Sequence, residues 1–124
     1  MLTDVPGSSD YFLLSLVTYS DASKIALLGV GPEVLEGHGA VSEAVARAMA
    51  AGARRVGVAD IGLAVTGIAG PSGGTPRKPI GLVFFCLDDG TKSTLDRRVF
   101  SGDRLAIKRQ GAEHALAMLC AHLD

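Results

Sequence analysis

The sequence predicts a single α/β domain whose mixed β-sheet is flanked by helices. Its 124 residues suit one domain. Hydrophobic residues make up 48% of the chain, which is enough for one core and argues against disorder. Short apolar runs alternate with helical periodicity in the order strand, helix, helix, strand, strand hairpin, helix. We expect a sheet with a parallel core plus an antiparallel hairpin, in one domain over residues 1–124.

The first part of the chain is expected to form a strand and a short helix. Residues 2–10 are rich in turn-forming Pro, Gly and Ser. The nearly continuous apolar run Tyr11–Tyr19 indicates a buried strand. Ser20 or Asp21 can then cap a helix that Gly29 ends.

A helical turn, a further helix and a second strand follow. Pro32 is placed to begin a helical turn. Ser42 is the next N-cap candidate, and small or apolar residues recur behind it at i, i+3, i+4 and i+7, which makes one helical face. Ile61–Val65 is the second buried strand, and it leads into a Gly- and Pro-rich loop, Thr66–Pro79.

The C-terminal part is expected to form a hairpin and a final helix. Ile80–Leu87 and Thr91–Phe100 are strand-like, and Asp88–Gly90 between them is a good hairpin signal. Asp103 can cap the last helix. One stripe of that helix is formed by Ile107, Gly111, Ala115, Met118, Leu119 and His122.

Charge and cysteine content exclude several classes of protein. With 12 basic and 13 acidic residues, the net charge of −1 predicts no broad attraction to nucleic acid or to an anionic membrane. No signal peptide and no apolar run of ~18 residues is recognised, so a cytoplasmic location is expected. Cys86 and Cys120 are interpreted as small buried hydrophobic residues. His38, His114 and His122 are expected at the surface or the core edge, without metal-like spacing.

The loop Thr66–Pro79 is the most unusual stretch of the sequence. Because it follows a buried strand, it should lie at the strand's C-terminal end, the edge where open α/β sheets bind ligands. Its four glycines let backbone N–H groups approach an anion or a carbonyl oxygen, and Arg77 and Lys78 add charge suited to a phosphate. A long connection between two strands is the structural alternative.

Other polar residues have plainer alternatives. Tyr19 can act as an acid, a base or a hydrogen-bond donor, or it can be a half-buried aromatic residue. Ser20 is expected to be a cap, and Lys24 a solvated helix residue. Arg104 follows Asp103 and is most simply a surface residue of the first helical turn.

Five segments carry a family resemblance. They are LTDVPGSSDYF (2–12), VTYSDASKIALLGV (17–30), HGAVSEAVARAMAAGAR (38–54), ADIGLAVTGIAGPSGGTPRKPIGLV (59–83) and FSGDR (100–104). In this order they resemble the C-terminal domain of CinA (competence/damage-inducible) proteins, a family of nicotinamide mononucleotide (NMN) amidohydrolases. The VTGIAGPxGGTPxKPxG block is highly specific.

The resemblance implies hydrolysis of the NMN carboxamide to nicotinic acid mononucleotide and ammonia, in pyridine-nucleotide salvage, with no metal or other cofactor. Such hydrolysis needs a nucleophile, a proton acceptor and donors for the oxyanion. Tyr19 resembles the family tyrosine thought to assist proton transfer, and N–H groups around Thr66 are candidate donors. The catalytic candidates are Tyr19 and Thr66, and the substrate-binding candidates are Gly67, Ile68, Gly70, Gly73, Arg77, Lys78 and Arg104.

The sequence departs from the family at two places. The family carries a strand and a Ser-Cys-Thr-Gly-Gly turn upstream of the segment that begins at Leu2, and the serine of that turn is the expected nucleophile. The sheet is therefore expected to lack the family's first strand and to leave an open edge and apolar surface. Leu14 and Ser15 stand where the family usually has two glycines.

Several interpretations of this difference stay open. The sequence fits a piece of a longer active protein or a shortened relative that binds a ligand without catalysing a reaction. It also fits an enzyme whose nucleophile is Ser8, Ser9, Ser15 or Ser20 in place of the family's upstream serine. The predicted function is therefore an amidohydrolase or, alternatively, a non-catalytic nucleotide-binding or oligomerisation module. A small nucleotide is the expected partner, and the open edge predicts a homo-oligomer.

Overall fold

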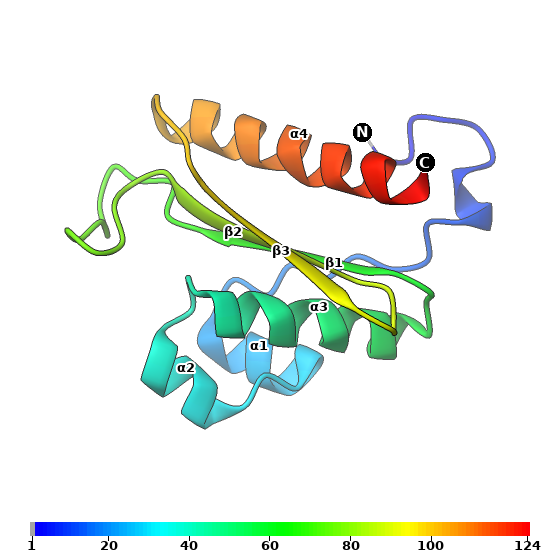
Figure 1. The fold of residues 1–124 in the computed structure, drawn as a ribbon, viewed down its shortest axis with the longest axis horizontal. Coiled ribbons are helices and arrows are strands. Elements are labelled where there is room, and N and C mark those ends of the chain that lie inside the picture. Colours follow the sequence, from blue (N-terminus) through cyan, green and yellow to red (C-terminus); the bar gives the residue numbers. More distant parts are fainter. Residues whose placement is uncertain (1) are drawn as a thin grey trace.

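A central three-stranded sheet lies between two helical layers in the computed structural model, which describes residues 2–124 (Figure 1). Helix α4 covers one face of the sheet, and α3 covers the other with α1 and α2 packed behind it. The elements are a 3-10 turn at Ser8–Asp10, the helices α1 (Asp21–Leu28), α2 (Pro32–His38), α3 (Glu43–Gly57) and α4 (Arg104–Leu123), and the strands β1 (Gly62–Gly67), β2 (Leu82–Asp88) and β3 (Ser93–Val99). The predicted single α/β domain is confirmed.

Pairing within the sheet differs from the prediction. The strand order is β1-β2-β3, and both pairs are antiparallel, with Gly62 opposite Asp88 and Leu82 opposite Val99. The expected parallel core is therefore wrong for the described strands. A parallel pair needs a crossover connection, usually through a helix, whereas residues 68–81 form a loop without a helix that returns the chain directly.

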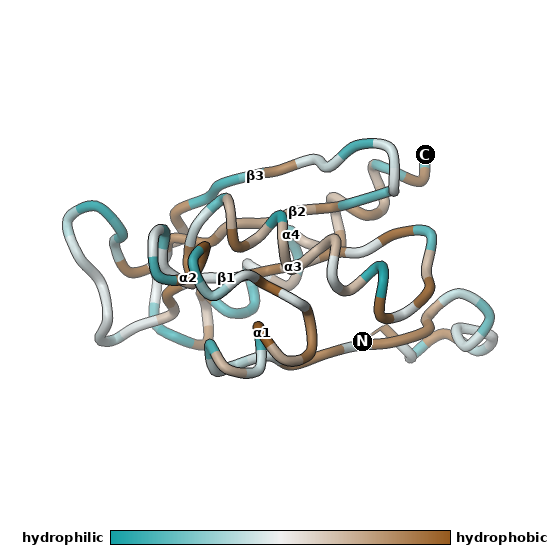
Figure 2. Tube along the Cα trace, turned by 90° about the horizontal axis from the view of Figure 1, so that it is seen from below, coloured by the Kyte–Doolittle hydropathy of each residue, from teal (hydrophilic) through white to brown (hydrophobic). Residues whose placement is uncertain are grey.

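Tyr11–Tyr19 was expected to be a buried strand, and that prediction is wrong. Residues 12–19 are extended but pair with no strand in the described structure, and Val17 is 87% exposed. Figure 2 shows them as an apolar stretch at the margin of the molecule, beyond β1 and leading into α1. Apolar composition marks a segment able to form a strand, but pairing needs another backbone within hydrogen-bonding distance.

Helix boundaries agree well with the capping residues read from the sequence. Ser20 Oγ accepts a hydrogen bond from the Ser23 N–H at 3.1 Å, and Ser42 Oγ accepts one from Val45 at 3.3 Å. Asp103 Oδ1 accepts one from Ala106 at 2.8 Å. Each cap satisfies an N–H of the first turn that has no partner inside the helix, so these helix starts are set locally.

The β2–β3 hairpin is also confirmed. Asp89 Oδ1 accepts hydrogen bonds from the N–H groups of Lys92 and Thr91 and from the Thr91 hydroxyl. These bonds, that of Lys92 first, hold the pKa of Asp89 far below its usual range. The Asp89 carboxylate therefore holds the loop between the strands, together with Asp88 Oδ1, which accepts from the Gly90 N–H at 2.8 Å.

The hydrophobic core has a part on each face of the sheet. Burial raises the pKa of the Cys86 thiol in the α3 part, as expected for a buried cysteine, whereas the predicted burial of Cys120 is wrong because it faces outward on α4. The buried residues of the α3 part are Leu28, Val30, Leu35, Val45, Ala46, Met49, Ala50, Ala64 and Cys86, and those of the α4 part are Val83, Phe85, Ile107 and Ala115.

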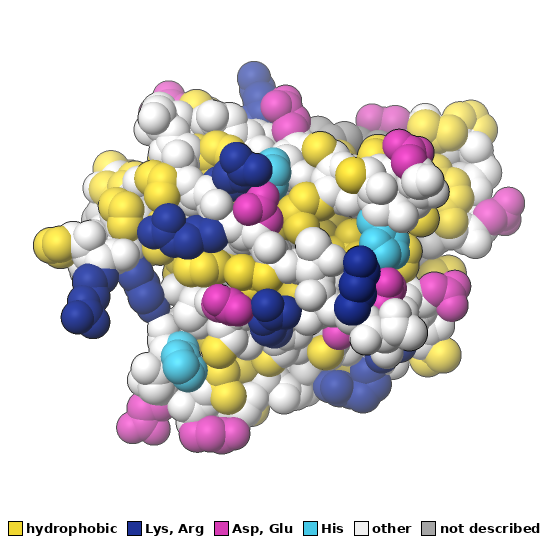
Figure 3. Space-filling model, in the orientation of Figure 1, with side chains coloured by type: hydrophobic (Ala, Val, Ile, Leu, Met, Phe, Trp, Pro, Cys, Tyr) yellow, Lys and Arg dark blue, Asp and Glu magenta, His cyan; other side chains and the backbone are white. Residues whose placement is uncertain are grey.

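Charge on the surface is mixed. On the face drawn in Figure 3, basic and acidic side chains are interspersed among apolar ones. This distribution agrees with the net charge of −1. None of the described helices is long and apolar enough to cross a membrane.

Candidate functional site

A groove of about 780 Å³ lies between the end of the N-terminal extended segment and the end of β1. Its walls also include Met49 of α3 and residues of α4. The loop after β1 lies at this end of the strand, as the sequence predicted. The predicted site residues that line the groove are Tyr19, Thr66, Gly67, Ile68, Gly70, Gly73 and Arg104.

Arg104 joins the two walls of the groove. It is the first residue of α4, and its Nη1 donates to the Gly70 carbonyl oxygen at 2.9 Å. Its Nη2 lies 3.5 Å from the Tyr19 hydroxyl, which is a long hydrogen bond. The Tyr19 side chain is 84% exposed, so the interpretation as a half-buried aromatic is wrong. A guanidinium and a phenol are thus placed together at the mouth of the groove.

Lys24 lines the groove, and its burial was not predicted from the sequence. It is only 5% exposed, although a solvated helix residue was expected. Its Nζ donates to the Thr18 carbonyl oxygen at 2.7 Å and lies 3.4 Å from that of Tyr19. Lys24 is four residues before the buried Leu28, and this i, i+4 spacing places both on one face of α1. That spacing is the sequence signal for its burial.

Backbone donors at the end of β1 are not equally available. The Ile68 N–H donates to the Leu82 carbonyl oxygen at 2.9 Å, so it is already paired. Hydrogen bonds alternate along an antiparallel strand, so Thr66 also bonds toward β2 and Gly67 directs its N–H to the open edge. The Thr66 hydroxyl donates to the Ala40 carbonyl oxygen at 2.8 Å. Gly67 is therefore the residue of this stretch whose N–H faces the groove side.

The loop after β1 uses glycine where the backbone requires it. Gly70 has a φ of 77°, a left-handed conformation, and a Cβ there would lie 2.7 Å from Ile80 Cγ2. Gly73 has a φ of 94°. These two positions let the loop fold back so that the Gly70 carbonyl reaches Arg104.

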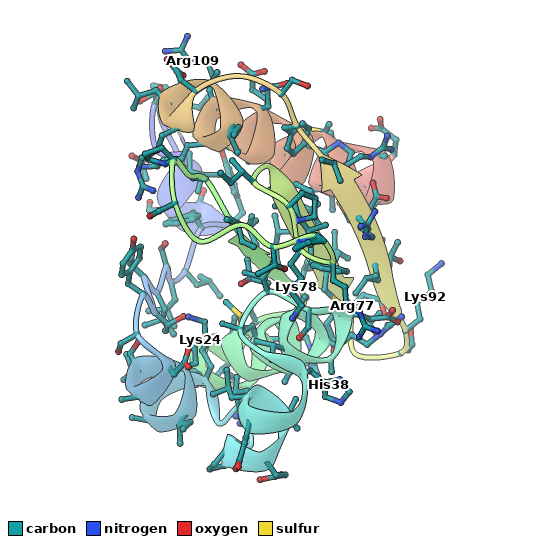
Figure 4. All side chains as sticks on the ribbon, turned by 90° about the vertical axis from the view of Figure 1, so that its left-hand side faces the viewer. Lys24, His38, Arg77, Lys78, Lys92 and Arg109 are labelled. Atoms are coloured by element: carbon teal, nitrogen blue, oxygen red, sulfur yellow. The ribbon has the colours of Figure 1, made fainter. Side chains whose placement is uncertain are left out.

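Two of the three basic phosphate candidates lie elsewhere. Lys78 donates through Nζ to the carbonyl oxygen of His38 at the end of α2, and Arg77 is exposed beside it (Figure 4). Neither residue lines the groove, whereas Lys108 does. Lys108 is four residues after Arg104, so one face of α4 presents both cations, a spacing visible in the sequence.

The groove has an excess of positive charge and no acidic lining. Lys24, Arg104 and Lys108 line it, and no aspartate or glutamate is among the lining residues described. Such a set of donors suits an anionic group such as a phosphate. Within residues 2–124, no group of three or more His, Cys, Asp or Glu side chains is arranged to hold a metal ion.

The serines considered as substitutes do not line the groove. Ser20 serves as the cap of α1, and Ser15 is exposed on the extended segment. The serine found in the lining is Ser72, in the loop after β1. Leu14 does not line the groove either, and it lies against Gly57 at the end of α3.

These features define an α/β domain with a nucleotide-sized, cation-lined groove at the end of its edge strand. A sequence model described as the CinA C-terminal domain matches residues 1–123. The chain belongs to this family.

Named relatives agree with this assignment. The chain is 50% identical over 118 residues to a putative competence-damage inducible protein of Moorella thermoacetica, covering 95% of this chain and 28% of that protein. It is 52% identical over 120 residues to a CinA-like protein of Mycobacterium tuberculosis, again covering 95% and 28%. The chain therefore spans less than a third of the length of these relatives.

Solved structures show the same fold. A competence/damage-inducible protein from Agrobacterium tumefaciens superposes with a TM-score of 0.94 at 38% identity, covering 99% of this chain and 76% of that one. A competence or damage-inducible protein from Enterobacter asburiae gives 0.93 at 35% identity, covering 99% and 77%.

Proposed function

We propose that this chain carries the substrate-binding and proton-transfer residues of an NMN amidohydrolase site, which converts NMN to nicotinic acid mononucleotide and ammonia in pyridine-nucleotide salvage. The observation that carries the proposal is the Arg104 bridge. Its guanidinium contacts both the Tyr19 hydroxyl and the Gly70 carbonyl at the mouth of a nucleotide-sized groove.

The phosphate end of NMN is assigned to α4. Arg104 and Lys108 lie one helical turn apart and both line the groove. A guanidinium can bind a phosphate through two parallel hydrogen bonds, and a lysine adds a point charge. No acidic side chain is among the described lining residues, so none of them competes for these cations within the groove.

The carboxamide end is assigned to the end of β1. The Gly67 N–H faces the open edge and can donate to the oxyanion that forms when the amide is attacked. The Tyr19 hydroxyl is the proton-transfer group, and Lys24 positions it by binding the carbonyls of Thr18 and Tyr19. The attacking serine implied by the family resemblance is not among these residues, so no attack step is assigned to them.

Binding of NMN to the purified chain, measured by calorimetry beside an assay of ammonia release, tests the proposal. We expect saturable NMN binding that Arg104→Gln weakens by at least about tenfold, because a charged hydrogen-bonded group is lost. Arg109→Gln is the matched control, since Arg109 is an exposed cation of the same helix that does not line the groove.

The two assays separate the roles. NMN binding that Arg104→Gln weakens and Arg109→Gln preserves would support the assignment of the phosphate end. Ammonia release abolished by Tyr19→Phe would add the proton-transfer role, and Ser72→Ala would then test the lining serine. Absence of NMN binding by a folded sample would overturn the proposal.

A further inference from the structure

The connection between α2 and α3 forms one wall of the groove, because Ala40 and Val41 are among the lining residues. Three consecutive carbonyl oxygens at the start of this connection each accept a hydrogen bond from a side chain. The acceptors and donors are His38 with Lys78 Nζ, Gly39 with Ser42 Oγ at 2.8 Å, and Ala40 with Thr66 Oγ1 at 2.8 Å. Two of the three donors come from distant parts of the chain, so the position of this wall depends on them.

Lys78 makes the longest of these connections in sequence, since it binds the last residue of α2, 40 residues earlier (Figure 4). A Cβ on Gly39 would lie 2.9 Å from Lys78 Nζ, so glycine at this position leaves room for the ammonium group. The carbonyl groups at the end of a helix carry a partial negative charge, which favours a cation there. The contact between Lys78 and α2 is therefore supported by both shape and charge.

Lys78 also belongs to a tight turn in the loop after β1. The Thr75 N–H donates to the Lys78 carbonyl oxygen at 2.8 Å, and the Lys78 N–H donates to Thr75 Oγ1 at 3.0 Å. Two residues later, Ile80 fills the inside of the loop. A Cβ on Gly70 would lie 2.7 Å from Ile80 Cγ2, and one on Gly74 would lie 2.8 Å from Ile80 Cγ1. Part of the segment between these two glycines lines the groove, so the anchored turn supports a second wall.

Arg77 provides a comparison within the same loop. It is exposed, and it makes no hydrogen bond or ion pair with any residue from 2 to 124. Lys78 is half-buried and bound to α2. Neither residue lines the groove. The two neighbours therefore carry the same charge and differ in whether they fix the backbone.

We propose that Lys78 is a positioning residue of the groove. It joins the loop after β1 to the end of α2 and so keeps two walls, residues 40–41 and residues 72–73, in the conformation that binds a nucleotide. Walls that are ordered before the ligand arrives lose less conformational freedom on binding, which strengthens the affinity. The effect on the nucleotide rests on the proposed function, whereas the coupling of the two walls does not.

Nitrogen-15 NMR relaxation of the chain without ligand tests the coupling. Lys78→Met keeps the length of the side chain and removes the ammonium group, and Arg77→Met removes the same charge from the neighbouring residue. In Lys78→Met, we expect the backbone order parameters of residues 40–41 and 72–73 to fall from about 0.85 to below about 0.6. Arg77→Met should leave them unchanged. Equal order parameters in the parent chain and in Lys78→Met would overturn the proposal.

Thr66→Val is a second variant, because it removes the other long-range bond to the same connection. It should lower the order parameters of residues 40–41 and leave those of residues 72–73 unchanged. Loss of order in both walls would place the coupling at the end of β1 instead of at Lys78, and would overturn the proposal. Circular dichroism checks that each variant is folded.

Calorimetry with NMN tests the effect on binding. Lys78→Met should bind NMN at least about fivefold more weakly than the parent chain, because both walls must become ordered on binding. Saturating NMN should return its order parameters toward those of the parent chain. Arg77→Met should bind within about twofold of the parent chain, since a solvated charge outside the groove is screened.

The outcomes separate this inference from the proposed function. Weaker NMN binding by Lys78→Met with unchanged order parameters would mean that the ammonium group binds the phosphate itself, and would overturn the positioning role. Equal NMN affinity of Lys78→Met and the parent chain would also overturn it, while leaving the proposed function intact. Absence of NMN binding by the parent chain would overturn the proposed function, and the order parameters without ligand would then decide the coupling alone.

Discussion

The two faces of the sheet are packed differently. On the α3 face, a Cβ at Gly52 of α3 would lie 2.0 Å from the Leu28 carbonyl oxygen of α1, and one at Gly62 of β1 would lie 2.2 Å from the Ala50 carbonyl oxygen of α3. On the α4 face, a Cβ at Gly111 would meet no atom within 4 Å. The α3 face of the sheet is therefore closely packed, whereas the free space beside α4 forms part of the groove.

The largest effect is expected at the centre of the α4 face. Phe85 is fully buried, with its ring centroid 4.6 Å from that of His114 and 6.2 Å from that of Phe100. Phe85→Ala should lower the free energy of unfolding by about 4 kcal/mol, because it removes a fully buried aromatic ring and leaves a cavity. Urea unfolding measures this change in the free energy of unfolding. A decrease below about 1 kcal/mol would mean that α4 moves onto the sheet and fills the space left by the Phe85 ring.

Gly52→Ala should be the next largest effect. The new methyl group would collide with the backbone of Leu28, so α1 and α3 must move apart. We expect a loss of about 3 kcal/mol in the same urea experiment. A loss near zero would show that the contact between α1 and α3 is adaptable, and the contrast between the two faces would fail.

Gly111→Ala is the matched substitution on the other helix and should have the opposite sign. Alanine has the higher helix propensity, and the added methyl group meets no neighbour. We expect a gain of up to about 1 kcal/mol. Destabilisation instead would indicate that α4 lies closer to its surroundings in solution.

The smallest effect concerns the hydrogen bond between Asp96 and His114 that links β3 to α4. Asp96 Oδ2 lies 2.6 Å from His114 Nε2 and accepts from Arg98 at 3.0 Å. Burial alone would raise the pKa of Asp96, but the hydrogen bonds from His114, Arg98 and the Arg97 N–H outweigh it and lower the pKa below the ordinary value. The lowered pKa of Asp96 therefore adds to the free energy of unfolding above about pH 4, and this contribution is lost as the pH falls further.

Asp96→Asn tests this link. It should cost at most about 1 kcal/mol at neutral pH, because the pair is partly solvated. It should also make the fall in stability below about pH 4 less steep than in the parent chain. Urea midpoints measured from acidic to neutral pH give both values. If stability falls equally steeply below about pH 4 in the variant and in the parent chain, Asp96 does not contribute to the pH dependence of stability.

Local features of the site were readable from the sequence, and non-local ones were not. The resemblance named Tyr19 and Arg104, and the structure brings their side chains together. Lys78 looked equally suited to a phosphate, yet it binds the end of α2. Which way a long cationic side chain turns depends on carbonyl groups supplied by distant segments, and spacing along the chain does not encode them.

The sequence by itself determined the caps at Ser20, Ser42 and Asp103 and the β2–β3 hairpin, because these depend on interactions within a few residues. Only the tertiary structure decided that β1 and β2 are antiparallel and that residues 12–19 stand apart from β1. Strand pairing depends on which backbone edges meet in space. The groove exists because two extended segments lie beside one another without meeting.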